Sequence, residues 1–590
     1  MTSTATTSIT GGDRSPQGYW TLAAEAGESH TPRRELMPGP GGRARTGTGR
    51  GTGAGTGDSV GEPLLTVAHL SDLHLCDSQS PARAEFLDRW ADPDSPLKPL
   101  IDAVGTYRAQ DCLTVQVAEA MVRAVNGLDR APVSGAPIDL ALTTGDVTDN
   151  AQANELSWYL SVLEGGPILP DSGDPTRYEG VGAADLPYWD EYFWHPDPIA
   201  AAAGNAALDR PRRLHGFPAA PGLLDALRMP FDAEGLTIPW LAVHGNHDQM
   251  VQGTIPAVGP FATAAFSQTK AIGVPEHWST DAIGQFCLDM DRCELPALAL
   301  WSSLRSRPAT PDPGRAPITR AEFIAAHFGL SAHPSGHGFP SSARESGLAY
   351  YRHDRGRVSI LALDTVNENG GWEGSIDPAQ LSWLAGELDE ADADRRLVVL
   401  ASHHPLHRLT NARTAAEQAA ALAGAGLEDG TDGSPGSPGS DGSPGTPGTD
   451  GPRVLSAELS AELARHACVV LWLNGHTHVS AVTPHPAAGA GGPWWEVTAP
   501  SLIDYPQQGR VVELLDDGAG ELTLACTMID HAGEVPWSGG VDTLTALAGL
   551  SRELAANDWQ DPAADLRRHR RVGTPLDRNV LLAIPDPFQP

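Results

Sequence analysis

The chain contains five short motifs rich in Asp, Asn and His, and each of them follows an apolar run. The motifs are Asp72-Leu73-His74, Gly145-Asp146-Val147-Thr148-Asp149, Gly245-Asn246-His247-Asp248, His403-His404-Pro405 and Gly475-His476-Thr477-His478. Such apolar runs are typical of buried strands, and the carboxyl ends of parallel strands lie at one edge of a sheet. The pattern therefore predicts an α/β fold that brings all five motifs to one edge.

Strand and helix patterns alternate between residues 63 and 530. Apolar runs predict strands at 64–70, 138–144, 238–243, 358–363, 397–401, 468–473, 494–498, 510–515 and 521–528. Helical spacing of apolar residues predicts helices at 115–128, 154–163, 377–390 and 455–467. The third of these helices begins with Asp377-Pro378, an N-cap followed by a proline at the first helical position. This alternation indicates a layered α/β fold.

Two long segments and one short segment interrupt the alternation. Residues 165–235 are rich in Pro, Gly, Ala, Trp and Tyr, and residues 250–345 contain many loop signals. Both segments leave from motif-bearing ends of strands, so we expect both to cover the active-site side. Residues 431–452 repeat Gly, Ser and Pro with Asp, which is typical of a flexible loop.

The composition changes at both ends of the chain. Residues 1–60 end in Gly, Thr and Arg repeats that bury too little apolar surface to order alone, although 18–22 could dock on the body. An amphipathic helix is expected near residues 541–556. We divide the chain into a flexible N-terminal extension at 1–60, a core domain at 63–530 and a C-terminal extension at 531–590.

The chain is strongly acidic. It has 40 Lys and Arg residues against 74 Asp and Glu residues, which gives a net charge of −34. A field of this sign repels nucleic acid and anionic membrane, so we expect neither as a general partner. It also repels phosphorylated compounds at long range. Bound cations would therefore have to supply positive charge locally if the substrate is a phosphate.

No feature of the sequence indicates export or membrane insertion. The chain has no run of about 18 apolar residues, and Met1 to Ala24 lack the apolar stretch of a secretory signal. Arg33-Arg34 is followed by Glu-Leu-Met-Pro instead of an apolar segment. The six cysteines are dispersed, and Cys76 near the first motif is interpreted as a packed side chain. We expect a cytoplasmic protein with free thiols.

The five motifs resemble those of the calcineurin-like metallophosphoesterases over most of residues 63–530. The resemblance implies an αββα sandwich that carries two metal ions. It assigns Asp72, His74 and His478 to the first metal, Asn246, His403 and His476 to the second, and Asp146 to a bridging position. His404 would then support the site without binding a metal. Mixed nitrogen and oxygen donors suit Mn, Fe, Zn or Co, and the sequence does not choose among these metals.

The same resemblance implies a mechanism. A hydroxide bridging the two metals would attack the phosphorus of an ester, because bound cations lower the pKa of water. His247 would assist the leaving group, and Asp149 would orient His247. Asp248 has two open interpretations, stabilisation of its loop or a catalytic role. Gly145, Gly245 and Gly475 would permit the tight turns that deliver the side chains to one point.

Details of the motifs favour one branch of this family. Purple acid phosphatases carry a tyrosine ligand three residues after the bridging aspartate and lack the histidine of the first motif, whereas this chain has Asp149 and His74. The motifs look most like those of class III cyclic-nucleotide and glycerophosphodiester phosphodiesterases, which are much shorter proteins. We expect hydrolysis of a small phosphodiester in preference to a phosphomonoester. The alternatives are a nuclease of the same superfamily and a metal-stabilised binding protein without turnover.

Two further segments bear on substrate binding. The aromatic segment Tyr188–Trp194 either grips a nucleobase or sugar or forms the apolar core of its insertion. The segment that contains Asp504 and Tyr505 either reaches the rim of the site or is an ordinary strand connection.

Overall fold

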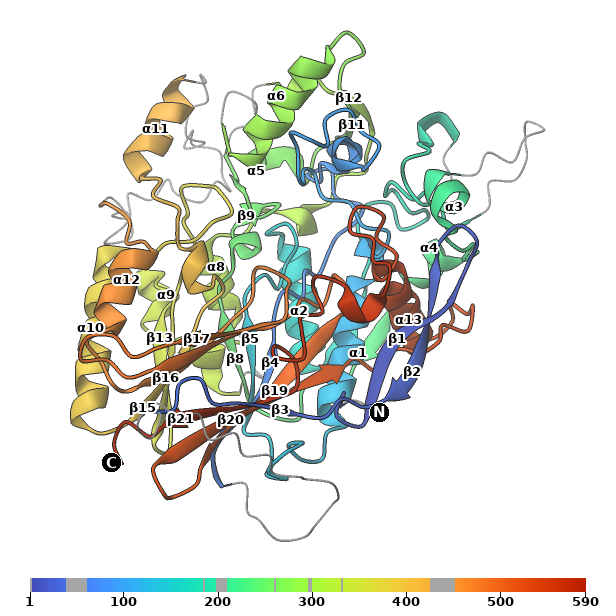
Figure 1. Cartoon of the computed structure of the whole chain (residues 1–590). Coiled ribbons are helices and arrows are strands. Elements are labelled where there is room, and N and C mark those ends of the chain that lie inside the picture. The colour runs from blue at the N-terminus through green and yellow to red at the C-terminus, as the bar shows by residue number, and fades with distance from the viewer. Residues whose placement is uncertain are drawn as a thin grey trace.

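Two sheets packed face to face form the body of the protein, with helices on both outer sides (Figure 1). The computed structural model describes residues 3–38, 61–183, 186–197, 209–258, 261–294, 300–329, 333–424 and 451–589. The predicted flexible loop at 431–452 lies almost entirely outside these residues. The prediction of an α/β sandwich with large insertions is confirmed.

The first sheet has six strands, and its four central strands are parallel. Their order is β13 (Tyr351–Arg355), β14 (Val358–Ala362), β15 (Leu397–Ala401), β16 (Val469–Asn474), β18 (Trp494–Thr498) and β17 (Ala481–His485). Successive residues of β15 alternate between two cores: Val399 packs between the sheets, whereas Val398 and Leu400 pack with α10 (Pro378–Ala393) and α12 (Ser456–Leu463). Burial on both faces explains why these strands are continuous apolar runs in the sequence.

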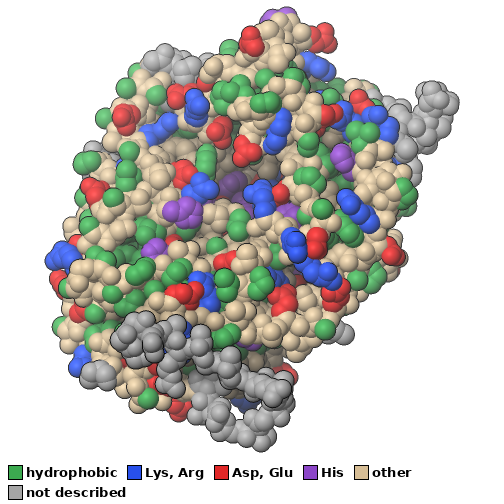
Figure 2. Space-filling model, viewed as in Figure 1, with side chains coloured by type: hydrophobic (Ala, Val, Ile, Leu, Met, Phe, Trp, Pro, Cys, Tyr) green, Lys and Arg blue, Asp and Glu red, His purple; other side chains and the backbone are tan. Residues whose placement is uncertain are grey.

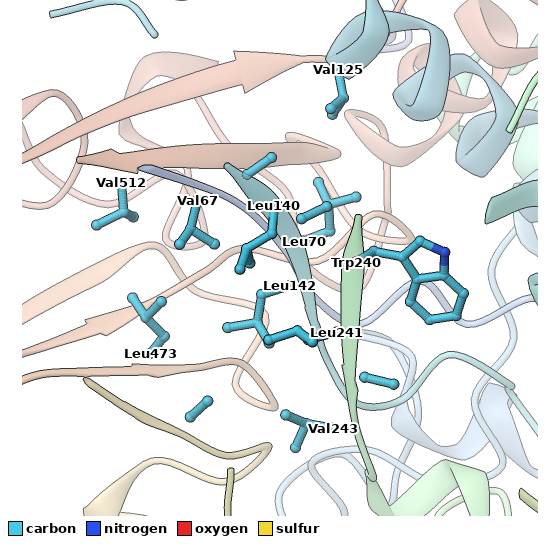
Figure 3. Close-up of a cluster of buried hydrophobic side chains, with 14 of the residues drawn as sticks. Val67, Leu70, Val125, Leu140, Leu142, Trp240, Leu241, Val243, Leu473 and Val512 are labelled. Carbon is cyan, nitrogen blue, oxygen red and sulfur yellow. The ribbon is translucent and has the colours of Figure 1, made fainter. Parts of the chain in front are cut away.

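The second sheet has seven strands, and β4, β5 and β8 in it are parallel. The order is β3 (Thr31–Arg33), β21 (Val580–Pro585), β20 (Glu521–Asp530), β19 (Gln508–Asp516), β4 (Glu62–Leu70), β5 (Leu140–Thr144) and β8 (Trp240–Val243). Helices α1 (Thr114–Asn126), α2 (Ala153–Glu164) and α13 (Leu544–Ala555) lie on its outer side. Figure 3 shows Leu473 of β16 facing the apolar side chains of β4 and β5, so one core joins the two sheets.

The chain ends differ from the expectation of separate extensions. Strands β1 (Thr7–Arg14) and β2 (Trp20–Ala26) form a hairpin, and β3 pairs in parallel with β21 at the edge of the second sheet. Strand β21 pairs with β20. Both ends therefore belong to the body where the structure describes them, because β21 covers an edge that would otherwise leave main-chain groups unpaired.

The two insertions contain short elements. Residues 165–235 form β6 (Gly166–Ile168), α3 (Arg210–His215), α4 (Leu223–Ala226) and β7 (Phe231–Ala233). Residues 250–345 form β9 (Met250–Val251), β10 (Ile255–Pro256), α5 (Phe261–Ala264), β11 (Thr269–Gly273), α6 (Thr280–Asp291), β12 (Arg305–Pro308), α8 (Arg320–Ala326) and α9 (Ala343–Ser346). Residues of the second insertion pack with the 3-10 helix η1 (Glu85–Ala91) and with α11 (Ala415–Gly424). Together they form an apolar core separate from the one between the sheets. Among the described residues, no helix has the length and apolarity needed to cross a membrane.

Candidate metal centre

All five motifs lie at the carboxyl ends of parallel strands. The first three follow β4, β5 and β8 of one sheet, and the last two follow β15 and β16 of the other. Main-chain hydrogen bonds join neighbouring loops within each sheet: Gly475 donates to the carbonyl of His403 at 3.0 Å, and Asp72 donates to the carbonyl of Gly145 at 3.1 Å. The two sheets are joined at this edge by the main-chain N–H of His476, which donates to Asp72 Oδ1 at 3.0 Å. The fold therefore places the predicted site residues at one edge of the sandwich.

The first and last motifs contact each other directly. His478 Nε2 lies 3.1 Å from His74 Nε2 and 3.4 Å from Asp72 Oδ1. The donor atoms of these three residues all lie within 4.8 Å of one another. Asp72 also accepts a hydrogen bond from the main-chain N–H of His476 at 3.0 Å, which fixes the carboxylate. These residues form the group that the resemblance assigns to the first metal.

A second group lies beside the first. His403 Nε2 is 3.1 Å from His476 Nδ1 and 3.2 Å from Asp146 Oδ2. The same oxygen of Asp146 is 3.8 Å from His74 Nε2 in the first group. Asp146 is fully buried and stands between the two groups, which is the place that a bridging carboxylate requires.

Asn246 lines the same cavity as Asp146 and His476. Its side-chain Nδ2 donates to the main-chain carbonyl of Gly253 at 3.0 Å, which fixes the orientation of the amide. The Oδ1 atom is buried and meets no hydrogen-bond donor among the described residues. A buried polar atom without a partner is costly. A cation at this position would satisfy it.

The motif loops are conformationally unusual. Five of the predicted ligands have positive φ angles: Asp72 (52°), His74 (44°), Asp146 (50°), His476 (67°) and His478 (57°). They make up five of the eleven non-glycine residues with positive φ in the described part of the chain. Backbone strain of this kind persists only where the surrounding structure enforces it, and it concentrates at functional sites.

The motif glycines act in two ways. Gly145 has a φ of 86°, in agreement with the predicted tight turn. At Gly245 and Gly475 the requirement for glycine is steric, because neighbouring side chains leave no space for a Cβ atom. A Cβ atom at Gly475 would lie 1.8 Å from Ser71 Oγ, and one at Gly245 would lie 2.3 Å from Asp146 Oδ1.

His247 is held by main-chain groups of the second motif. Its Nδ1 lies 2.6 Å from the carbonyl oxygen of Asp149, and its main-chain N–H donates to Asp146 Oδ1 at 2.8 Å. The Asp149 carboxylate contacts Arg83 and lies 3.4 Å from His74 Nδ1. Burial alone would raise the pKa of Asp149, but the Arg83 cation and His74 outweigh it and lower that pKa. The main-chain carbonyl of Asp149 thus contacts His247, and the side-chain carboxylate of Asp149 contacts His74.

Asp248 stabilises the loops. Its carboxylate accepts hydrogen bonds of 2.9 Å from the main-chain N–H groups of Val147, Thr148 and Gly245. The side chain is fully buried, and burial raises its pKa to about 6. These contacts tie the second motif to the third and favour the first of the two interpretations of this residue.

His404 lies behind the second group. Its Nε2 is 3.0 Å from the carbonyl oxygen of Trp372, and its Nδ1 is 2.8 Å from Thr365 Oγ1. Both ring nitrogens have partners, and one of them also lies within 4.8 Å of nitrogens of His403 and His476. The supporting role of His404 stays a prediction.

Asp504 is a contributor that the motifs did not reveal. Asp504 Oδ2 lies 2.6 Å from His478 Nδ1, and the carboxylate also pairs with Arg108 at 2.6 Å and with Arg571. Asp504 is 3% exposed, so it is an interior support and does not reach the rim. Its place shortly after β18 was the only sequence signal, and no pattern indicated either arginine.

The electrostatic field at the site favours cations. Burial disfavours a charge on His403, but the carboxylates of Asp146 and Asp72 outweigh burial and raise the pKa of His403 to about 9. Burial likewise opposes ionisation of Asp146, yet the neighbouring histidines hold its pKa well below the usual range. Two ionised carboxylates among imidazoles form a donor set suited to divalent metals.

A cavity of about 580 Å³ opens in front of these groups. Asp146, Asn246, His247, His476 and His478 line one side of it. Residues 100–106 and the end of α6 line the opposite side, so the second insertion covers the site as expected. No residue of the first insertion lines this cavity in the described ranges. Figure 2 shows histidine and basic side chains around a hollow near the middle of this face.

Comparisons with known proteins give distant structural matches. No protein-family model matches the chain, and a search of curated proteins also gives no match. A dimetal phosphatase from Danio rerio has 11% identity and a TM-score of 0.34, over 80% of this chain and 100% of that one. A purple acid phosphatase from yellow lupin seeds has 10% identity and a TM-score of 0.27, and the match covers 78% of this chain and 51% of the phosphatase. GAP50, the anchor in the inner membrane complex of Plasmodium, has 9% identity and a TM-score of 0.22, over 80% and 87%.

The chain thus resembles the calcineurin-like metallophosphoesterases in its five motifs, in its two-sheet sandwich and in the convergence of those motifs at one edge.

Proposed function

We propose that the protein is a metal-dependent phosphoester hydrolase that uses two metal ions and prefers diesters to monoesters. The observation that carries this proposal is the convergence of six Asp and His donors from four loops, with Asp146 between the two groups and Asn246 of a fifth loop in the wall of the same cavity. With Asn246 included, three of the donors are carboxylate or amide oxygens and four are imidazole nitrogens. The set has the mixed character of a site for Mn, Fe, Zn or Co.

The spacing of the donors fits bound cations. Two ligands that each lie about 2.0–2.1 Å from one cation are separated from each other by roughly 3 Å. The nitrogens of His74 and His478 are 3.1 Å apart, and so are those of His403 and His476. Each pair matches that separation. We assign Asp72, His74 and His478 to the first metal, Asn246, His403 and His476 to the second, and Asp146 to both.

Bound metals would supply positive charge for the phosphate oxygens and would lower the pKa of water. Hydrolysis adds water across a P–O bond, so the departing ester oxygen needs a proton. His247 lines the cavity, and its Nδ1 is engaged by the Asp149 carbonyl. The other ring nitrogen, Nε2, is therefore the atom that we assign to hold this proton and give it to the leaving group.

The shape of the cavity supports a small substrate. A volume of about 580 Å³ is in the range of pockets that enclose small molecules. Apolar side chains such as Leu100, Ile101 and Leu288 line the wall opposite the donors. The second ester group of a diester could pack against this wall, whereas a monoester has no group to place there.

The first experiment compares hydrolysis of bis-(p-nitrophenyl) phosphate and p-nitrophenyl phosphate by the purified protein, with added manganese and after chelation. We expect metal-dependent turnover that is faster for the diester. A faster reaction with the monoester would reverse the assigned preference. The absence of turnover from protein that holds two metals per chain would contradict the proposed function and favour a binding protein.

A further inference from the structure

The aromatic segment Tyr188–Trp194 divides into a buried half and an accessible half. Phe193 and Trp194 are 6% and 2% exposed, and the Trp194 indole donates to the carbonyl of Pro218 at 2.9 Å. This half is core, as one of the two interpretations of the sequence expected. Tyr188 is 37% exposed, and Trp189 is half-buried. The accessible half therefore presents ring surface to solvent.

The accessible half lines a second cavity of about 280 Å³. Its other walls come from η1, through Phe86 and Trp90, and from the β11–β12 hairpin. This cavity shares no lining residue with the cavity of the metal centre. It is a separate site whose size is near the lower end of small-molecule pockets.

The second cavity is positively charged in a chain whose net charge is −34. Arg89, Arg305 and Arg307 line it, together with one carboxylate, that of Asp190. Asp190 pairs with Arg89. Arg305 is exposed and lies within 4 Å of no carboxylate oxygen among the described residues. The cavity therefore has a cation available for an anionic ligand.

Aromatic rings and guanidinium groups lie next to one another in the wall of the cavity. Arg307 is 7% exposed and lies over the Tyr188 ring at 6.0 Å. The Trp189 ring stacks on His195 with 5.5 Å between ring centroids. Its buried indole Nε1 meets no acceptor among the described residues. This atom has almost no accessible surface, so Trp189 offers the cavity the surface of its ring and not its N–H.

We propose that this second cavity binds a small aromatic anion. The rings of Tyr188 and Trp189 would pack against the aromatic part of the ligand, since such stacking accepts any flat ring system. The guanidinium of Arg305 would bind the acidic group, because its planar fork matches carboxylate, phosphate or sulfonate oxygens. The site is independent of phosphoester hydrolysis.

The test is a fluorescence titration of the metal-loaded, full-length protein with 1-anilinonaphthalene-8-sulfonate. Its uncharged counterpart, N-phenyl-1-naphthylamine, reports the apolar contribution alone. The titration is made without and with inorganic phosphate, which competes for the metal centre. We expect one saturable site per chain for the sulfonate and about tenfold weaker binding of the uncharged probe, on the scale of one charge-assisted hydrogen bond.

Variants locate the bound probe. Arg305→Gln removes an exposed charge and should weaken sulfonate binding about tenfold without changing the affinity for the uncharged probe. Trp189→Ala should weaken both probes. Arg465→Gln, which changes an exposed arginine outside the cavity, is the matched control and should leave both affinities unchanged. Circular dichroism verifies that each variant is folded.

Three results would overturn the proposal. Equal affinity for the two probes would mean that the cavity is merely apolar. Displacement of the sulfonate by phosphate to the same extent in the unmodified protein and in Arg305→Gln would place the probe at the metal centre. Unchanged sulfonate binding by folded Arg305→Gln would show that Arg305 does not bind the anion. This result decides the question even if Trp189→Ala does not fold.

Discussion

The imidazoles of the two proposed metal-binding groups differ in the residues that contact their outward nitrogens. In the first group, the outward nitrogen of His478 lies 2.6 Å from the Asp504 carboxylate, and that of His74 lies 3.4 Å from the Asp149 carboxylate. In the second group, the outward nitrogen of His403 lies 2.8 Å from the main-chain carbonyl of Thr144. Carboxylates support one group, and neutral backbone supports the other.

The difference extends to the remaining donors. Asp72 brings a charge to the first group, whereas Asn246 brings a neutral oxygen to the second. A carboxylate behind an imidazole makes it a stronger donor and adds negative charge, while a carbonyl group chiefly orients the ring. We infer that the first group holds its metal more tightly than the second. Asp146 is the only proposed ligand common to both groups.

Asp146→Asn should have the largest effect because it weakens both groups together. We expect turnover to fall by about a thousandfold or more, on the scale of several kcal/mol of charge stabilisation that metals provide. Both metals should be lost on dialysis, as measured by inductively coupled plasma mass spectrometry. His353→Gln, a histidine change on the edge strand β13, is the control. Loss of only one metal would show that Asp146 does not bridge.

His247→Ala separates metal binding from chemistry. Removal of the proton donor should lower the rate of hydrolysis by about a hundredfold or more. Both metals should remain, because His247 is not assigned to either group. The measurements are turnover of bis-(p-nitrophenyl) phosphate and metal content on the same preparation. A parallel loss of metal and rate would make His247 a ligand and would contradict its assigned role.

Of the two groups, Gly253→Ala acts on the second, through Asn246, and it also displaces His247. Gly253 has a φ of 64°, and a Cβ there would lie 2.5 Å from Asn246 Nδ2 and 2.2 Å from His247 Cδ2. Misplacement on this scale should lower turnover about a hundredfold. The protein should retain one metal per chain. Gly518→Ala, with a φ of 69° and open space around it, is the matched control for backbone strain.

Retention of both metals by Gly253→Ala would show that Asn246 contributes little to the second site. Loss of both would mean that the two groups are not separable, and the comparison between them would fail.

The gathering of the proposed ligands at one edge could be predicted from the sequence because each belongs to a contiguous motif after an apolar strand. The supports could not, since they come from distant parts of the chain. Arg108 and Asp504 are 396 residues apart, and Asp504 and Arg571 are 67 residues apart. The role of Gly253 depends on a close approach of its backbone to two side chains, which leaves no residue pattern.

The fold shows the same division. Helices α1, α2 and α10 lie within a few residues of their predicted ranges because their capping and spacing are local signals. The strands at the chain ends were missed, although β21 is an apolar run. Its partners lie far away in the sequence, β20 about fifty residues earlier and β3 near the start, so no local pattern marks the pairing.

Asp504→Asn tests the first group and should have the smallest effect on turnover. The substitution keeps a hydrogen-bond acceptor near His478 Nδ1 but removes the charge behind the imidazole. Affinity for the first metal should fall about ten- to a hundredfold, the usual cost of losing such a support. Competition with a fluorescent chelator measures this affinity. Asp561→Asn is the matched control, because Asp561 also pairs with Arg571 but makes no contact with His478.

If the Asp504 and Asp561 variants weaken metal binding equally, the effect belongs to Arg571. The carboxylate beside His478 would then add nothing to the metal affinity of the first group. The inferred difference in affinity between the two groups would lose its main support.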